Sequence, residues 1–419
     1  MRHQRTDARM GNQTDKTDST TCADGQTVNR ALSLYYVMPR EMYFGPSRAT
    51  SIDLCVRDIV TASRYFSSTK IFAERIDRCF SGFNIDYFPP ARMALTYSRA
   101  DYVTKKARLE RPDAIIVEQH LPTAAAVVRR MPGTKVILHR HNFAKAFTSR
   151  MSIRDRVGRA FRKRRYTQLA GIVHVSEACA EAFAQAWPDV SIPTCVVHNG
   201  LDFAEWKPHA ERTREILLVG RCAPEKGIIE AAQGVIAILE AFPDWRARFL
   251  LSNVETHPDY FAQLREMLTT LGRRVEIKSQ VPFAEVKEAY EQAAIALVPS
   301  TWREPFGRTA LEAHAGGAAL ISSGTGGLTE ISGDAALMLP SVTPQIIAAY
   351  IRRLIEHPEL RQRLAEEGAD RVRSRFDIKT QASRLDAFCQ AVAGGMVAGC
   401  RQDRTTHGCD GGEEGWKVA

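Results

Sequence analysis

Residues 300–331 read STWREPFGRTALEAHAGGAALISSGTGGLTEI, a succession of strand, loop and helix signals. The apolar run Ala294–Ser300 predicts a short buried strand, and a helix is expected from near Gly307 to about Ala315. A second strand at Ala318–Ser323, the glycine-rich loop Gly324–Gly327 and another helix start follow. Strands and helices that alternate in this way are typical of a parallel sheet with crossover helices, so we expect an α/β protein.

Two glutamates of this stretch are candidates for ligand contact. Glu304 lies in the loop at the carboxyl end of the first strand, where α/β sheets bind ligands, and Glu312 lies within the helix. The backbone amides of Phe306 and Gly307 are expected at the start of that helix, where unpaired N–H groups bind anions or hydroxyls. The alternative for either glutamate alone is an ordinary solvated side chain.

The segment REPFGRTALEAHAGGAALISSGTGGLTEI resembles the donor-site signature of the family-four retaining glycosyltransferases, which have the GT-B fold. That fold has two Rossmann-like domains that face each other across a cleft. The spacing of the glutamates, the loop glycines and the trailing glycine pair agree with the signature. The resemblance implies that Glu304 faces the hydroxyls of the donor sugar and that Glu312 holds the nucleotide ribose. It covers roughly residues 31–392 and is strongest over 214–340.

A second motif opens the predicted C-terminal domain. The apolar strand Arg214–Gly220 runs into RCAPEKG, in which Arg221 and Lys226 flank a tight loop. Two cations at the mouth of a β-α unit suit a diphosphate, since each charge-assisted hydrogen bond contributes about 1.5–3 kcal/mol. Solvated side chains beside a turn are the alternative. The family resemblance favours the diphosphate, because Gly-Arg…Glu-Lys-Gly is similar to its diphosphate-binding signature.

The predicted N-terminal domain supplies the other site candidates. The strand Ala31–Pro39 is followed by a loop with Gly45 and Arg48, which in the resemblance corresponds to a glycine loop on the acceptor side. His139 and His141 lie at the end of a later strand, at the carboxyl edge of the sheet. The family has a histidine beside the reacting sugar. His141 matches it best, and His139 is the second choice.

Residues 150–166 (RMSIRDRVGRAFRKRRY) carry eight basic side chains and one aspartate. They also have a modest apolar stripe, formed by Met151, Val157, Ala160 and Phe161. A basic amphipathic helix indicates an anionic membrane surface. The alternatives are a solvated helix face and nucleic acid, the weaker of the two because aromatic residues are not interleaved with the basic ones. The residues assigned to the membrane surface are Arg154, Arg162, Lys163, Arg164 and Arg165.

Composition limits the class of protein. The 419 residues suffice for two domains, and a formal net charge of +9 favours acidic partners such as nucleotide phosphates, anionic lipids or nucleic acid. Nine scattered cysteines without a Cys-x-x-Cys pair predict reduced thiols in a cytosol and no structural zinc site. No Asp-x-Asp motif occurs, which favours a metal-independent enzyme. No apolar run reaches the length of about 18 residues that a membrane span needs.

The predicted domain organisation has six parts. They are a disordered leader over residues 1–30, an acceptor-side Rossmann-like domain over 31–202, a linker over 203–213, a nucleotide-sugar-binding Rossmann-like domain over 214–377, a C-terminal helix over 378–392 that crosses back to the first domain, and a disordered tail over 393–419.

The resemblance implies a retaining glycosyltransferase that moves a hexosyl group from a nucleoside-diphosphate sugar to a glycan or lipid-linked acceptor. Cell-surface polysaccharide or lipopolysaccharide synthesis is the expected pathway. Glu304 and His141 would lie at the reacting sugar, and no cofactor or metal would be needed. We expect a cytoplasmic protein, attached peripherally to the inner face of the membrane, with nucleic acid not a partner. The alternatives are a GT-B nucleotide-sugar epimerase, which needs no acceptor, and a non-catalytic basic membrane-associated scaffold.

Overall fold

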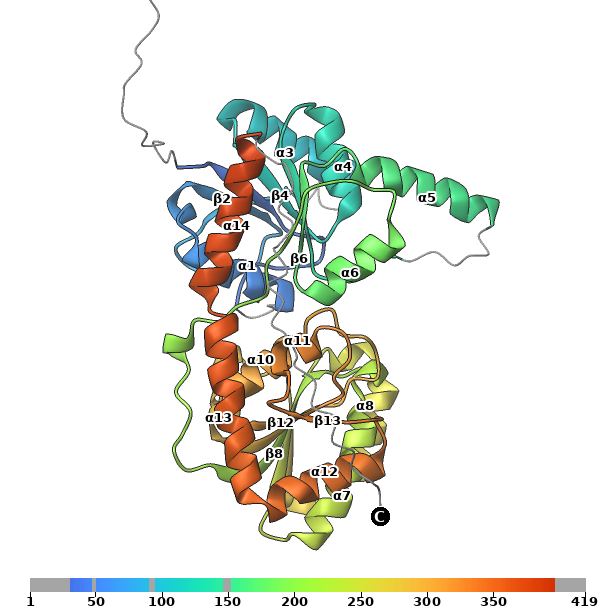
Figure 1. Ribbon diagram of the computed structural model, residues 1–419, viewed down its shortest axis with the longest axis vertical. Helices are drawn as coiled ribbons and strands as arrows, with labels where there is room; N and C mark the ends of the chain where they lie inside the picture. Colours follow the sequence, from blue (N-terminus) through green and yellow to red (C-terminus); the bar gives the residue numbers. More distant parts are fainter. Residues whose placement is uncertain (1–30, 47–49, 90–94, 146–151, 396–419) are drawn as a thin grey trace, which may run out of the picture. The chain divides into compact units, whose positions relative to one another are not determined.

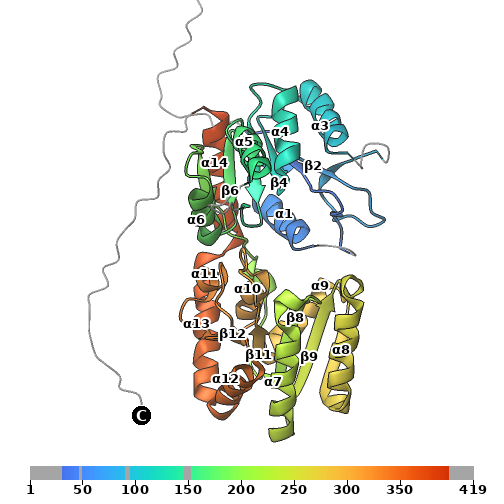
Figure 2. The same ribbon diagram turned by 90° about the vertical axis from the view of Figure 1, so that its right-hand side faces the viewer.

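The computed structural model describes residues 31–46, 50–89, 95–145 and 152–395. The helices and strands belong to one unit that begins at Leu32, and they form two parallel β-sheets with helices on both faces (Figures 1 and 2). The predicted leader, Arg48 and nearly all of the predicted tail lie outside the described residues.

The first sheet has seven parallel strands in the order β3-β2-β1-β4-β5-β6-β7. The chain order reverses between β1 and β4, and such a switch point is where α/β sheets bind ligands, at the carboxyl ends of the strands. The strands are β1 (Leu34–Val37), β2 (Thr69–Ala73), β3 (Asn84–Tyr87), β4 (Ala114–Glu118), β5 (Val136–Arg140), β6 (Gly171–His174) and β7 (Thr194–Val196).

Side chains of β1 alternate between two apolar cores. Leu34 and Tyr36 pack in the core that contains α1 and α14, while Tyr35 and Val37 pack in the core that contains α3, α4 and α6. The last helix, α14, therefore returns to the first sheet, where it lies beside α1 (Figure 1). The helices are α1 (Ser51–Ala62), α3 (Thr96–Glu110), α4 (Leu121–Arg130), α5 (Ile153–Tyr166), α6 (Glu177–Ala186) and α14 (Ile378–Ala393).

The second sheet has six parallel strands in the order β10-β9-β8-β11-β12-β13, with its own reversal between β8 and β11. The loops that follow β8 and β11 carry the two sequence motifs singled out above, so both motifs lie at this switch point. The strands are β8 (Thr213–Arg221), β9 (Arg246–Ser252), β10 (Val275–Ser279), β11 (Ala293–Val298), β12 (Ala319–Ser322) and β13 (Leu337–Met338).

Helices cover both faces of the second sheet. One core contains α7 (Ile228–Ala241), α8 (Pro258–Thr269) and α12 (Pro344–Glu356); α7 and α8 are seen beside β8 and β9 in Figure 2. The other contains α9 (Phe283–Gln292), α10 (Arg308–Ala315), α11 (Leu328–Ser332) and α13 (Pro358–Arg375). Short 3-10 turns lie at Phe66–Ser68, Phe203–Glu205, Pro224–Lys226, Val254–Thr256 and Gly272–Arg274. Among the described helices, none has both the length and the apolar character needed to cross a bilayer.

Candidate functional site

Lys226 and Glu304 are brought into direct contact by the loops after β8 and β11. The Lys226 ammonium lies 2.5 Å from Glu304 Oε1, and the Ser300 hydroxyl donates to the same oxygen at 2.5 Å. Glu304 is buried and the Lys226 side chain is only 20% exposed, so solvent screens this pair less than a surface ion pair. The switch point of the second sheet thus holds a cation against a carboxylate.

Backbone contacts between three loops hold this pair in place. The Thr301 N–H donates to the Glu225 carbonyl at 2.9 Å, and the Gly327 N–H donates to the Glu304 carbonyl at 2.8 Å. Gly227 has φ +65°, and a side chain there would overlap the carbonyl oxygen of Pro299. Glycine is required at position 227, because a side chain would push the loop of Lys226 away from the loop of Glu304.

The step from Phe306 to Gly307 starts α10. The Phe306 ring is buried near His198 and Phe376, with ring centroids 6.0 and 5.8 Å away, so a ligand contact at this residue has to come from its backbone. Gly307 has φ +107°, and a side chain there would overlap Leu328. The Phe306 side chain is therefore part of the core that shapes the loop, and the predicted amide donors are backbone groups.

Glu312 is held by Arg308, one helical turn earlier. Arg308 Nε donates to Glu312 Oε1 at 2.7 Å, and Nη2 donates to Asp58 of α1 at 3.0 Å. Burial raises the pKa of Glu312, and the charge of Arg308 opposes this rise. One oxygen of the carboxylate is therefore committed to the arginine, and the same arginine ties α10 to α1.

Arg221 is the last residue of β8, whereas Lys226 lies in the loop that follows, and the two side chains have different surroundings. The Arg221 guanidinium pairs with Glu225 at 3.0 Å, and its side chain is 46% exposed. Arg221 therefore lies on an exposed rim, whereas Lys226 is packed against Glu304.

His139 and His141 both contact one buried carboxylate, that of Glu118. Glu118 ends β4 and pairs in register with His139 of β5. Its Oε2 lies 2.6 Å from His141 Nε2 and 3.1 Å from His139 Nδ1. Burial by itself would raise the pKa of Glu118, but the charges of and hydrogen bonds from the two histidines bring this pKa to about 2. The carboxylate is thus ionised near neutral pH.

Among the described residues, one group has donor atoms close enough together to hold a metal ion. The donor atoms of Glu118, His139 and His141 all lie within 4.8 Å of one another. Two ligands of one tetrahedral zinc ion lie about 3.3 Å apart, because each bond is about 2.0–2.1 Å long. The 2.6 Å between His141 and Glu118 is shorter and has the length of a charge-assisted hydrogen bond. Hydrogen bonding alone therefore accounts for the cluster.

Of the two acceptor-side candidates, only Gly45 is among the described residues. A side chain on Gly45 would overlap the carbonyl oxygen of Arg78. Close backbone packing therefore explains this glycine without a ligand.

The residues assigned to a membrane surface lie on α5, which begins with a capping box between Ser152 and Asp155. Lys163 pairs with Asp189 at 2.8 Å, as does Arg159, so this side of the helix faces the domain. The other four assigned residues form no ion pair with a described residue; they are Arg154, Arg162, Arg164 and Arg165.

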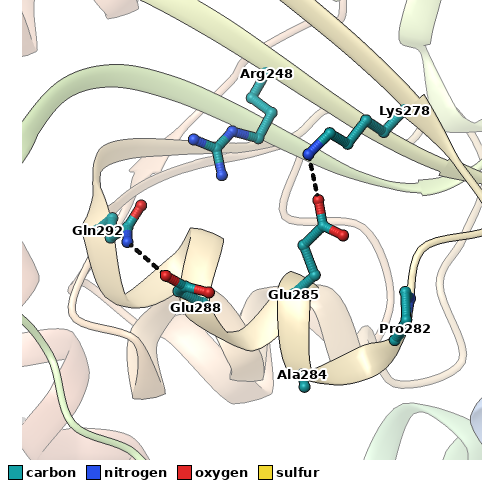
Figure 3. A pocket seen from close by; sticks show the side chains of 7 residues that line it. All are labelled: Arg248, Lys278, Pro282, Ala284, Glu285, Glu288 and Gln292. Atoms are coloured by element: carbon teal, nitrogen blue, oxygen red, sulfur yellow. Dashed lines mark hydrogen bonds and ion pairs between the residues drawn. The ribbon is translucent and has the colours of Figure 1, made fainter.

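A surface hollow lies away from the switch point, between β9, β10 and α9 (Figure 3). Its charged side chains already have partners: Lys278 pairs with Glu285 at 2.6 Å, Arg248 pairs with Glu215 at 3.1 Å, and Glu288 accepts from Gln292 at 3.0 Å. A ligand would have to displace these pairs, so the hollow is a poor candidate for a binding site. It is lined by Arg248, Lys278, Pro282, Ala284, Glu285, Glu288 and Gln292.

Family models match both halves of the chain. Residues 202–371 match the model described as Glycosyl transferases group 1, and residues 64–205 match the model described as Glycosyltransferase Family 4. The chain belongs to the group 1 glycosyltransferases. The first of these matches contains Lys226, Glu304 and Glu312, and the second contains Glu118 and His141.

Curated relatives cover part of this glycosyltransferase. Glycogen synthase of Mycobacterium tuberculosis (strain H37Rv) is 30% identical over 194 residues, which are 45% of this chain and 46% of that protein. D-inositol 3-phosphate glycosyltransferase of Corynebacterium glutamicum is 28% identical over 202 residues, 47% of each chain. The chain thus spans about half the length of these curated relatives.

Solved structures with the same fold cover most of the chain. Anabaena HepE, solved in complex with UDP and glucose, has a TM-score of 0.69 at 18% identity, over 86% of this chain and 100% of that one. Sucrose-phosphate synthase of Thermosynechococcus elongatus has a TM-score of 0.66 at 17% identity, over 87% and 100%. The GT-B fold predicted from the sequence is confirmed.

The sequence analysis did not identify three residues that contact the candidate site residues or the elements around them. Arg308 stands four residues before Glu312, a spacing that places both on one helix face. Glu118 ends the apolar strand AIIVE, so a charge at the carboxyl end of a strand was the available signal. Glu330 accepts from the N–H groups of Glu177 and Ala178 at 2.8 and 2.6 Å, which caps α6, and no sequence pattern indicates so distant a contact.

Proposed function

We propose that this glycosyltransferase moves a hexosyl group from a nucleoside-diphosphate sugar to a glycan or lipid-linked acceptor, with retention at the anomeric carbon. The observation that supports it best is the contact between Lys226 and Glu304 at the switch point of the second sheet, within the matched family segment. Since HepE was solved with UDP and glucose, UDP-glucose is the first donor to test.

Lys226 is proposed to bind the diphosphate. Its ammonium has three N–H donors, and Glu304 occupies one of them, so two remain for phosphate oxygens. Arg221 supplies a second cation from the exposed rim by releasing Glu225. Two cations at the diphosphate neutralise the charge that develops on the leaving group, which is the role that a metal ion has in other transferases.

Glu304, Glu312 and His141 are proposed to orient the sugar and the ribose. An ionised carboxylate accepts hydrogen bonds only, so it suits hydroxyl groups as partners. Glu304 would take hydroxyls of the hexose and Glu312 those of the ribose, each with the oxygen that is not committed to Lys226 or Arg308. His141, in the other domain, would contact the hexose beside the reacting carbon.

The acceptor is proposed to be part of a cell-surface polysaccharide or lipopolysaccharide, reached by an enzyme that binds an anionic membrane through α5. Ile153, Val157 and Phe161 are 82%, 50% and 61% exposed and follow one another at four-residue spacing, so they form one stripe. At about 3.6 residues per turn this stripe lies roughly opposite Tyr166, the buried residue of α5. Figure 1 shows α5 extending away from the first sheet.

Charge and apolar surface on α5 act together in this proposal. Arg154 and Arg164 lie on the same face of the helix as the apolar stripe, and each basic residue near an anionic bilayer contributes about 1 kcal/mol to binding. The exposed apolar side chains would enter the boundary between headgroups and acyl chains. A solvated helix has no need of three large apolar side chains on its outer face.

Vesicle co-sedimentation tests the membrane part. We expect binding to vesicles with phosphatidylglycerol at low salt, weak binding to phosphatidylcholine alone, and loss of binding in Ile153→Ser/Phe161→Ser. Leu109→Ser is the matched control, because Leu109 is 76% exposed but belongs to α3. Failure of the wild-type protein to bind anionic vesicles would contradict this part.

Turnover of UDP-, GDP- and ADP-glucose tests the transfer reaction. We expect release of one nucleoside diphosphate in the presence of a chelator, faster with a glycan acceptor pool, and an α-linked product by NMR. Conversion of the donor to an epimeric sugar without acceptor would establish the epimerase instead. If the wild-type protein turns over none of these donors, the result would favour the alternative of a non-catalytic membrane-associated scaffold.

A further inference from the structure

Glu118 is a buried carboxylate at the carboxyl edge of the first sheet. It ends β4, beside the switch between β1 and β4, and its side chain has no solvent exposure. A charged group in such a place is costly unless it is paired and hydrogen-bonded. Both partners of Glu118 are histidines, and one of them is His141, the residue proposed to contact the donor sugar.

The hydrogen bond to Glu118 decides which nitrogen of His141 carries a proton. An ionised carboxylate only accepts, so His141 Nε2, 2.6 Å from Glu118 Oε2, must donate. Burial, and after it the neighbouring His139, lowers the pKa of His141, although Glu118 opposes this. In the neutral ring Nδ1 then has a lone pair and accepts a hydrogen bond.

The backbone next to Glu118 holds the backbone of His141. Gln119 has φ +59°, a strained conformation for a residue with a side chain. Its N–H donates to the His139 carbonyl at 2.7 Å, and its side-chain oxygen accepts from the His141 N–H at 2.8 Å. Residues 118 and 119 therefore fix both the ring and the main chain of His141.

We propose that Glu118 is a positioning residue for glycosyl transfer: it holds His141 with Nε2 protonated, so that Nδ1 accepts a hydrogen bond from a hydroxyl of the donor sugar. This rests on the proposed function, in which His141 lies beside that sugar. His139 pairs with the same carboxylate from within β5 and so helps to hold it. No proton is transferred in this role.

Glu118→Gln tests the role, with Asp386→Asn as the matched control. Asp386 of α14 is another buried carboxylate, which accepts from the Ser63 hydroxyl at 2.6 Å and the Arg64 N–H at 3.0 Å. With whichever of UDP-, GDP- and ADP-glucose the wild-type protein turns over, we expect Glu118→Gln to lower kcat about tenfold or more, because a neutral acceptor replaces a charged one. The Kd for the free nucleoside diphosphate should stay the same, and Asp386→Asn should change neither quantity.

A double variant shows whether Glu118 acts through His141. If it does, Glu118→Gln/His141→Ala is no slower than His141→Ala alone, because the interaction is already lost. If the double variant instead loses kcat by the product of the two single-variant factors, the proposal is overturned. Activity that a chelator abolishes and zinc restores would also overturn it, since the cluster would then hold a metal.

Nitrogen-15 NMR of the histidine rings gives a readout that needs no activity. We expect wild-type His141 to carry its proton on Nε2 at neutral pH, and Glu118→Gln to show a mixture of both tautomers. A proton on Nδ1 in the wild-type protein would overturn the proposal. If no nucleotide sugar is turned over, the proposed function fails, while the NMR result still decides whether Glu118 fixes the tautomer.

Discussion

Lys226 Nζ and Glu304 Oε1 lie 2.5 Å apart, although 78 positions separate the two residues in the chain. The contact exists because β8 and β11 are neighbours in the sheet, so the loops after them meet at one edge. Each side chain neutralises the other, and each keeps polar atoms that this contact does not use. In the proposed function, their contact places the diphosphate site next to the sugar site.

Glu304→Gln should separate these two functions. Free nucleoside diphosphate should bind as tightly as before or more tightly, because the carboxylate that competes for Lys226 is gone. The nucleotide sugar should lose about tenfold or more in affinity relative to the free nucleotide, since a charge-assisted hydrogen bond contributes about 1.5–3 kcal/mol. Calorimetric titration with the nucleotide sugar and with the free nucleoside diphosphate measures the ratio of the two affinities.

The matched control for that experiment is Glu285→Gln, because Glu285 forms a similar pair with Lys278 at 2.6 Å in the surface hollow. It should leave both affinities unchanged. Equal losses for free nucleotide and nucleotide sugar in Glu304→Gln would contradict the assignment of Glu304 to the sugar.

Arg308→Ala should destabilise the fold. It leaves Glu312 without its buried cation and breaks the contact with Asp58, and removing one partner of a buried ion pair costs about 3–5 kcal/mol. Urea unfolding measures the loss. Arg352→Ala is the control: Arg352 pairs with Glu356 at the same four-residue spacing, but both side chains are 47% exposed, so the loss should be about 0.5 kcal/mol or less. Similar losses in the two variants would show that Arg308 has no special role.

Gly307→Ala should cost more than Gly133→Ala. Both glycines have positive φ, +107° and +89°, so alanine is strained at either position. At Gly307 the new methyl group would also overlap Leu328, whereas the space at Gly133 is open. We expect lower stability and weaker nucleotide binding for Gly307→Ala in the same unfolding and calorimetric measurements. Equal effects at the two positions would rule out crowding at the start of α10.

The sequence was sufficient where one short stretch carries both the structural and the chemical signal. Gly227, Gly307 and Glu304 could be placed on loops after strands because each strand is apolar and is followed by a helix. β13 is harder to predict: the composition of residues 334–340 (DAALMLP) suits a longer strand, but only Leu337–Met338 pairs with β12. An edge strand needs partners on one side only, so its ends depend on the neighbouring strand and not on its own composition.

His174→Phe should make stability less dependent on pH. Burial, and after it the charges of Arg140 and His139, lowers the pKa of His174 to about 3, against an ordinary value of about 6.5 in the unfolded chain. Between these two values the unfolded chain binds more protons, so the free energy of unfolding falls as the pH falls. From pH 7 to pH 5 the loss due to this residue is about 2 kcal/mol.

Urea unfolding of the wild-type protein and His174→Phe at both pH values checks this. The other titrating groups are common to both proteins, so the difference isolates His174. The same loss on acidification in both proteins would mean that His174 is protonated in the folded state.

Long-range pairing could not be predicted from the sequence. Glu118 and His141 lie 23 positions apart, and Arg308 and Asp58 lie 250 apart. Which charge meets which depends on strand order and on helix packing, and neither leaves a local pattern. For the basic helix α5, the sequence shows the charges but not their contacts. Only the structure shows that Lys163 forms an ion pair with Asp189 and that Ile153 is exposed.

Thermal unfolding of the wild-type protein with UDP, GDP and ADP and their glucose conjugates, in the presence of a chelator, tests the donor site most directly. A ligand at 100 times its Kd should stabilise the protein by about 2.7 kcal/mol. We expect the nucleotides with one of the three bases to raise the melting temperature of the wild-type protein, and we expect no such rise in Lys226→Ala. A wild-type protein that responds to none of these nucleotides, or a rise that is unchanged in Lys226→Ala, would contradict a donor site at Lys226 and Glu304.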